Sequence, residues 1–361
     1  MRLLASKYSS ALRATCTFLL LTILATLSAT AQIGGSTTYN FLSLSPDARI
    51  TALGGTNITI FDHDVSTQLA NPASLNRRMN GQAAFSTMIY PGGVNFGNIG
   101  YARRFKVPGT FGFGLQYMAY GKMKETDEAG NILGNMSAGE MNVYTGYGYQ
   151  FGRLFSVGAN AKFIYSQLAQ YSSVGMAADI GFTINDTAHN VTASLVARNI
   201  GGQFKPYNKG TKEAAPFDLQ AGISFGFKKM PFRIHATFHH LTVWDIRYDN
   251  PADQVQDNLF EDTAAKPKKY IADKLFRHVI IGVEVNIKKI VRLQVAYNHL
   301  RQQELLLNGR RGVPGLSFGL GLRLRQFDFS YAFQPMAQGQ VANHLTLTIY
   351  TNGFAKRKTV Q

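Results

Sequence analysis

The sequence predicts an all-β protein, a transmembrane antiparallel β-barrel of about fourteen strands with an N-terminal plug or hatch segment. Three observations lead to this fold class. From about residue 82, segments of roughly ten residues alternate between large apolar and small or polar side chains. The connections between these segments are alternately short and long. Charged residues make up only 16% of the chain and aromatic residues 12%, with 35 glycines, whereas globular domains carry about 25% charged residues.

Residues 1–31 are expected to be a cleaved signal peptide. Three cations precede an apolar run at 17–27, and Ala29-Thr30-Ala31 then fits the small-x-small cleavage pattern, so Gln32 would begin the mature chain. A membrane anchor helix is the alternative, but it needs about 20 apolar residues, more than this run supplies. We therefore expect export to the outer membrane of a Gram-negative bacterium. The three cations are Arg2, Lys7 and Arg13.

Composition excludes several classes of protein. The only cysteine, Cys16, lies in the leader, so the mature chain is expected to hold no disulfide and no thiolate metal site. No apolar stretch of about 18 residues follows the leader, which excludes a helical membrane protein. The net charge is +16, or +13 without the three leader cations. This basic balance favours anionic partners, with acidic surface glycolipid more plausible than nucleic acid for an exported chain.

The alternation has a period of two, which places each apolar set on one face of a strand. A soluble β-sandwich would also alternate. Here, however, the apolar set is large and rich in aromatic residues, as a lipid-facing band requires, and the opposite set is small or polar, as a lumen requires. The apolar members of four such segments are Phe111, Phe113, Leu115 and Tyr117; Val279, Ile281, Val283 and Val285; Val291, Leu293, Val295 and Tyr297; and Phe327, Phe329, Tyr331 and Phe333.

The strands alternate with connections in the manner of a bacterial barrel. We expect strands at 82–90, 94–105, 110–120, 139–150, 154–168, 173–184, 191–200, 216–227, 232–246, 276–287, 291–303, 313–324, 326–335 and 341–351. Long connections are expected at 121–137, 201–215 and 247–275. Because short turns face the periplasm and long loops face outward, both termini are expected to be periplasmic. The barrel would then span 81–354, followed by a basic C-terminal tail at 355–361.

Residues 32–80 do not alternate and contain turn-forming pairs. A barrel of this size has a lumen too wide for its own wall side chains to fill. We therefore expect this segment to fold inward as a hatch, and a periplasmic tail is the alternative. Its motif residues are Gly54, Gly55, Asn71 and Pro72.

Several charged residues fall on the predicted lumen face. A charge on the lipid face costs roughly 2–4 kcal/mol near the middle of the membrane, so inward placement is expected. We interpret these charges as a network that braces the hatch rather than as a transport path. They are Lys162, Asp179, Asp218, Glu284, Arg292, Arg323 and Asp328.

No enzyme is expected, with no catalytic, cofactor-binding or metal-binding residue. Two G-x-S-x-G matches, around Ser224 and Ser317, lie inside predicted strands, whereas a hydrolase elbow needs a strand-to-helix turn. His235, His239 and His240 cluster on one predicted strand. Residues four apart on a strand are about 13 Å apart, so His235 and His239 are too distant to share one metal. Polar histidines that face the lumen are the expected interpretation.

The outer connections supply the candidate partner-binding residues. A basic rim is expected to meet anionic glycolipid or an acidic protein, and a merely solvated loop surface is the alternative. Trp244, the only tryptophan, is expected near the outer end of a strand, where it is either an interfacial anchor or a contact with a partner. The basic candidates are Lys205, Lys209, Lys212, Lys266, Lys268, Lys269, Arg310 and Arg311.

The motifs resemble a known family. The runs ARITALGG at 48–55 and NPASL at 71–75 are similar to the N-terminal hatch of the long-chain fatty acid transporter (FadL-like) barrel superfamily. The resemblance implies fourteen strands with a hatch inside. Within that superfamily, nearly the whole mature chain resembles the PorQ family of the type IX secretion system. The motifs that carry this are DEAGNILG at 127–134, AKFIYSQL at 161–168, RNIG at 198–201, PFDLQ at 216–220, WDIRYD at 244–249, ADK at 272–274 and RH at 277–278.

The resemblance implies a non-enzymatic component of the type IX attachment complex that anchors a cell-surface partner of the PorZ kind. Further implied partners are PorU, PorV, lipopolysaccharide and outer-membrane lipid, and cargo would be attached to lipopolysaccharide. The second function considered is a FadL-like channel for hydrophobic small molecules. Such a channel needs an apolar pocket and a lateral opening in the wall, which Gly97 and Gly100 could supply through a strand kink.

Overall fold

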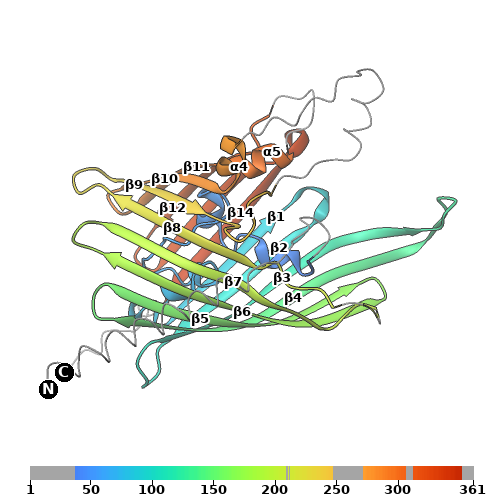
Figure 1. The fold of residues 1–361 in the computed structure, drawn as a ribbon, viewed down its shortest axis with the longest axis horizontal. Coiled ribbons are helices and arrows are strands. Elements are labelled where there is room, and N and C mark those ends of the chain that lie inside the picture. The colour runs from blue at the N-terminus through green and yellow to red at the C-terminus, as the bar shows by residue number, and fades with distance from the viewer. Residues whose placement is uncertain (1–36, 209, 211, 247–270, 306–311, 352–361) are drawn as a thin grey trace, which may run out of the picture. The chain divides into compact units, whose positions relative to one another are not determined.

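A computed structural model describes residues 37–208, 210, 212–246, 271–305 and 312–351. Within them, fourteen antiparallel strands close into one barrel (Figure 1). Each strand pairs with its neighbours in sequence, and β1 pairs with β14 to close the ring. The predicted antiparallel β-barrel and its strand number are confirmed. The strands are β1 Gln82–Ile89, β2 Asn95–Arg103, β3 Thr110–Thr126, β4 Ile132–Phe151, β5 Phe155–Leu168, β6 Tyr171–Asp186, β7 Val191–Lys205, β8 Asp218–Gly226, β9 Phe232–Phe238, β10 Val279–Ile287, β11 Val291–Asn298, β12 Leu316–Arg323, β13 Phe327–Pro335 and β14 Val341–Tyr350.

The two faces of the wall differ as the alternation predicts. Large apolar side chains point outward, where Ile281 is 51% exposed and Phe329 is 46% exposed. Between them, polar and small residues such as Glu284 and Ser330 are buried on the inner face. This arrangement suits an outer-membrane barrel, because exposure of so continuous an apolar band to water would be unfavourable, whereas lipid covers it.

The described helices are short. They are the 3-10 helices η1 Asn40–Ser43, η2 Val65–Leu69, η3 Pro72–Ser74, η4 Arg77–Met79, η5 Pro91–Gly93 and η6 Ala337–Gly339, and the α-helices α2 Ala48–Ala52, α4 Ile271–Arg277 and α5 His299–Leu305. Among the described residues, no helix combines the length and the apolar character needed to cross a membrane.

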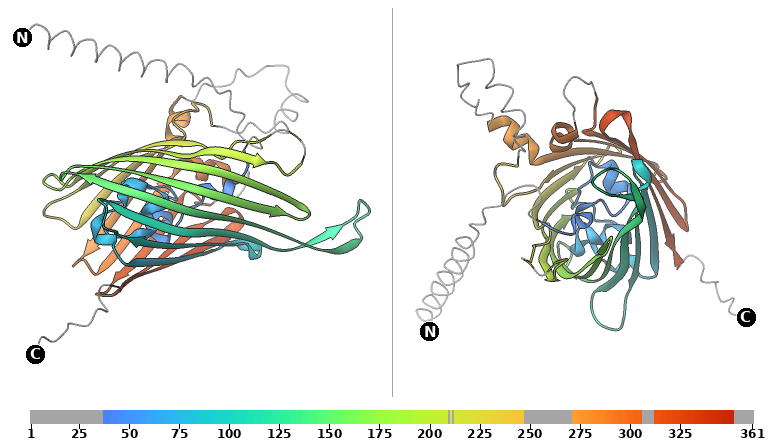
Figure 2. Two further views of the ribbon diagram at one scale, coloured as in Figure 1. Left: turned by 90° about the horizontal axis from the view of Figure 1, so that it is seen from below. Right: turned by 90° about the vertical axis from the view of Figure 1, so that its right-hand side faces the viewer.

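The connection predicted as a long loop at 121–137 is a β-hairpin instead, because β3 and β4 both extend across it. Its turn is closed by Asp127, whose Oδ1 accepts a hydrogen bond from the backbone N of Asn131 at 2.7 Å. The hairpin projects past the rest of the barrel wall (Figures 1 and 2). Near its tip, Ile132 and Leu133 are 61% and 67% exposed.

β9 is shorter than the predicted strand at 232–246. It ends at Phe238 because His240 adopts a φ of +54°, which an extended strand does not allow. The backbone N of Leu241 then donates to the carbonyl oxygen of Leu219 at 3.1 Å. Trp244 therefore lies beyond the strand, in a connection whose residues 247–270 are outside the described part of the chain.

Residues 37–81, which we call the inner segment, lie within the ring of strands (Figure 2, right). The inner segment contains η1, α2, η2, η3 and η4, and most of its side chains are buried. α2 contacts β11 to β14, η2 contacts β1 and β2, and η3 contacts β4 to β6. The inner segment and the barrel therefore form one compact unit.

Substitution of an outward-facing residue by lysine tests whether the outer face of the barrel contacts lipid or water. Ile180 lies in the middle of β6 and is 58% exposed. We expect Ile180→Lys to destabilise the lipid-embedded barrel by about 2–4 kcal/mol, since the cation would sit in hydrocarbon. Urea unfolding in phospholipid vesicles measures this loss. If the lysine left the free energy of unfolding unchanged, the outer face would be in contact with water.

Candidate functional site

The barrel interior is the candidate site, and the inner segment occupies it. The inner segment contacts the wall at glycines, where the wall has no side chains. A Cβ added at Gly158 of β5 would lie 2.3 Å from the carbonyl oxygen of Pro72, and one at Gly148 of β4 would lie 2.5 Å from Cβ of Leu75. The wall glycines thus allow η3 to pack directly on the backbone of β4 and β5.

Asn71 links the inner segment to the wall by hydrogen bonds. Its Nδ2 donates to Oγ1 of Thr183 on β6 at 2.9 Å and to the carbonyl oxygen of Ile58 at 2.8 Å. Its Oδ1 accepts from the backbone N of Ala73 at 2.9 Å, which caps η3. Pro72 occupies the first helical position, where its missing N–H costs nothing. The asparagine-proline pair therefore shapes the turn and attaches it to the wall.

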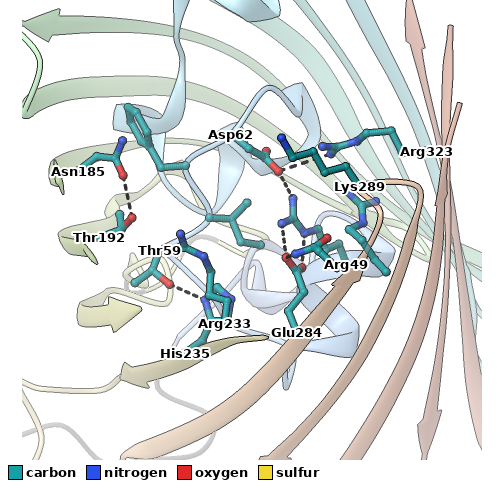
Figure 3. Close-up of a pocket in the computed structure, with 14 residues that line it drawn as sticks. Arg49, Thr59, Asp62, Asn185, Thr192, Arg233, His235, Glu284, Lys289 and Arg323 are labelled. Atoms are coloured by element: carbon teal, nitrogen blue, oxygen red, sulfur yellow. Dashed lines mark hydrogen bonds and ion pairs between the residues drawn. The ribbon is translucent and has the colours of Figure 1, made fainter. Parts of the chain in front are cut away.

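Arg49 of α2 makes the main ionic contact between the inner segment and the wall (Figure 3). Its guanidinium donates to both carboxylate oxygens of Glu284 on β10, at 2.8 and 2.9 Å. It also pairs with Asp62, to which Arg323 of β12 adds a contact at 3.5 Å. Glu284 is 1% exposed. Burial disfavours the Asp62 carboxylate, but Arg49, Arg323 and Arg292 outweigh this and lower the pKa of Asp62.

Beside Arg49 lies a cavity of about 320 Å³ (Figure 3). It lies at the end of the interior that carries the short turns, which is the periplasmic end in bacterial barrels. Lys289 of the β10–β11 turn lines it, as do Asn185 and Thr192, which flank the β6–β7 turn. The cationic side chains that line it outnumber the acidic ones, so the cavity can accept an anionic group. The cations are Arg49, Arg233, Lys289, Arg292 and Arg323, and the acidic residues are Asp62 and Glu284.

Part of the outer half of the interior is apolar. Tyr39, Phe41 and Leu42 of the inner segment pack against inward side chains of β1, β2, β5, β6 and β14. We call this group the apolar cluster. Its wall members are Met88, Phe96, Ile164, Ala177 and Ala342, and it also includes Ala215, with the partly buried Leu44, Tyr90, Met118 and Met336 packed against it.

The wall does not kink at Gly97 or Gly100. β2 pairs without a break with both β1 and β3, and the ring of Tyr117 covers Gly97. The suggested lateral opening at these glycines is therefore absent from this structure. The pairing of β3 with β4 shifts register instead between Ala119 and Lys122.

A groove of about 430 Å³ lies close to this shift. Its lining comes from both faces of β4, since Glu140 is 7% exposed and Met141 is 39% exposed. The full lining is Met118, Ser137, Ala138, Gly139, Glu140, Met141, Tyr165 and Gln167.

The predicted lumen charges are placed inward. Lys162, Asp179, Glu284, Arg292 and Asp328 are buried, Asp218 is half-buried, and Arg323 is 30% exposed at its side chain. Lys162 pairs with Asp179 at 2.8 Å within the wall, and Arg292 pairs with Asp328. Only some of the predicted charges, Glu284 and Arg323 among them, form ion pairs with the inner segment.

The structure places only part of the predicted outer rim. Lys205, the last residue of β7, and Lys212, in the β7–β8 connection, are both exposed. Trp244 is 60% exposed and stacks on His278 with ring centroids 6.0 Å apart. The remaining candidates, Lys209, Lys266, Lys268, Lys269, Arg310 and Arg311, lie outside the described residues.

Sequence reasoning did not single out the basic periplasmic turns. Their cations stand at or beside short connections between strands and were visible in the sequence as charged turn residues. They are Arg103, Arg104, Lys106, Arg153, Lys228, Lys229, Lys288, Lys289 and Arg325.

The two G-x-S-x-G serines have structural roles: Ser224 Oγ accepts from Arg233 and Ser317 Oγ accepts from Arg301.

No protein-family model matches the chain, and no curated protein matches it. Among solved structures, the CymD monoaromatic hydrocarbon channel is similar with a TM-score of 0.51 and 11% identity, over 86% of this chain and 98% of that chain. The Ralstonia pickettii toluene transporter TbuX gives a TM-score of 0.48 and 13% identity, over 86% and 98%. A Pseudomonas aeruginosa FadL homologue gives 0.46 and 11%, over 88% and 99%. At such identity the CymD likeness concerns the fold alone, and this chain therefore shares the barrel fold of that outer-membrane channel.

Proposed function

We propose that this chain is an outer-membrane channel for hydrophobic small molecules. The observation that carries the proposal is the apolar cluster, which lies inside a barrel whose inner surface is elsewhere largely polar. Its methionines Met88, Met118 and Met336 are flexible and polarisable, so they adapt to ligands of different shape. The hydrocarbon channel CymD has the same fold and supports this choice.

The charges at the periplasmic end suggest the direction of passage. A hydrophobic molecule that entered from outside would meet the apolar cluster first, and the ionic contacts of Arg49 would oppose its further descent. The groove beside Met118 and Met141 offers an exit toward lipid, because its lining joins the inner and outer faces of β4. This route leaves the inner segment in place.

Uptake of two radiolabelled probes, toluene and oleate, by cells that carry the barrel in their outer membrane tests the proposal. Uptake above that of empty-vector cells is expected for at least one probe. Met118→Glu should abolish this gain by placing a charge in the apolar lining. The matched control is Met123→Glu on the same strand, where the side chain is 37% exposed on the projecting hairpin, and uptake should be unchanged.

A second function is anchoring of a type IX attachment complex, as the sequence resemblance implies. Exposed apolar side chains outside the lipid-facing band favour it: Ile132 and Leu133 near the hairpin tip, and Trp244. Such groups are typical of protein contacts. Co-purification of PorZ-like, PorU-like or PorV-like proteins from mild detergent, together with no uptake of either probe, would replace the channel proposal with this one.

A further inference from the structure

Asp218, His239 and His240 meet at the outer end of β8 and β9. One potential ligand atom from each, a carboxylate oxygen or a ring nitrogen, lies within 4.8 Å of the others. The sequence predicts His235 and His239 on one strand, too far apart for a common ion. His235 instead contacts Thr59 deeper in the barrel, away from His239. Because β9 ends at Phe238, His239 and His240 lie beyond the strand and can approach Asp218.

The backbone holds these three residues in place. Asp218 Oδ1 accepts a hydrogen bond from the backbone N of His240 at 2.6 Å. The next residue, Leu241, donates to the carbonyl oxygen of Leu219 at 3.1 Å, and the N of His239 donates to the carbonyl oxygen of His278 at 3.0 Å. The side chains are therefore positioned by the first residues of β8 and the start of β10, and do not depend on a loose loop.

His239 is a buried imidazole with an unmet hydrogen-bonding requirement. It is 4% exposed, and its Nε2 has no hydrogen-bond partner among the described residues. Its Nδ1 lies 2.6 Å from Nδ1 of His240. A buried polar atom without a partner is costly, and a bound cation would remove this cost.

We propose that Asp218, His239 and His240 bind one divalent transition-metal ion of the zinc type. Two imidazole nitrogens and one carboxylate oxygen are ligands that such ions prefer, with bonds of about 2.0–2.2 Å. Ligand atoms already within 4.8 Å of one another need only small side-chain rotations to reach those bonds. Three protein ligands leave a coordination position for water or for a group of a partner.

The surroundings supply the support that metal sites need. Gln220 Nε2 donates to Asp218 Oδ2 at 2.6 Å and so orients the carboxylate. The ring nitrogens of His278 lie 2.9 Å from the carbonyl oxygen of His239 and 3.2 Å from that of Trp244. The ion would therefore join β8 to the end of β9 and, through His278, to the segment that carries Trp244. We infer a structural ion that stiffens the outer rim.

Zinc titration of the full-length barrel in detergent, stripped with EDTA and free of any histidine tag, tests the inference. Isothermal calorimetry should show one site per chain, and the thermal midpoint should rise with Zn²⁺ and not with Mg²⁺. Asp218→Asn keeps an oxygen for the N–H of His240 but loses the charge. It should weaken zinc binding at least about tenfold, the loss that even outer-shell partners cause. His240→Ala should act in the same direction.

The control is His299→Ala, which removes another histidine of the outer end. His299 pairs with Asp273 at 2.9 Å and is not a proposed ligand. Zinc binding that is absent from the wild type, retained in Asp218→Asn and His240→Ala, or lost equally in His299→Ala would overturn the site. Retention of zinc-induced stabilisation by folded Asp218→Asn would do so as well. The probe-uptake result has no bearing on this test, so the two proposals fail separately.

Discussion

Arg49→Gln is expected to release the inner segment from β10 while the barrel stays closed. The reason is that Glu284, only 1% exposed, would keep its charge and lose its bidentate partner. Removal of one partner from a buried ion pair costs about 3–5 kcal/mol. Hydrogen exchange should rise at α2 and around Asp62, with little change in the strands. In planar bilayers, the variant should conduct where the wild type conducts little, because the inner segment fills the interior.

Two comparisons separate this effect from a general loss of charge. Arg77 is an exposed cation of the same inner segment, and Arg77→Gln should leave exchange and conductance unchanged. The double variant Arg49→Gln with Glu284→Gln should recover much of the loss, since no uncompensated carboxylate remains. Equal exchange in Arg49→Gln and the wild type would show that this ion pair does not hold the inner segment.

The strands were predictable because lipid imposes one rule on every second residue. Charged side chains such as Glu284 and Arg292 had to face inward, and the structure places both there. The strand ends were less predictable, since they depend on local hydrogen bonds. The Asp127 turn extends β3 and β4, and the positive φ of His240 ends β9.

The interior contacts were hidden from sequence for a different reason. The inner segment has no hydrophobic period, so nothing identified Arg49 as the partner of Glu284 at a distance of 235 residues. In the sequence, the lumen glycines were interpreted as small wall residues, and only the structure shows that the inner segment packs on them. In the same way, the cluster of Asp218 with His239 and His240 was not predicted, because residues 232–246 were expected to form one continuous strand.

Gly148→Ala is expected to displace η3 from the wall, because the new Cβ would lie 2.5 Å from Cβ of Leu75 and 2.7 Å from its carbonyl oxygen. Overpacking of this kind costs about 1–3 kcal/mol. The matched control is Gly134→Ala on the same strand, where the nearest atom is 3.9 Å away. Hydrogen exchange at 71–75 and bilayer conductance should rise in Gly148→Ala and not in Gly134→Ala. Equal behaviour of the two variants would mean that η3 does not rest on β4, whereas a rise in the first alone would identify wall glycines as the surface that holds the inner segment.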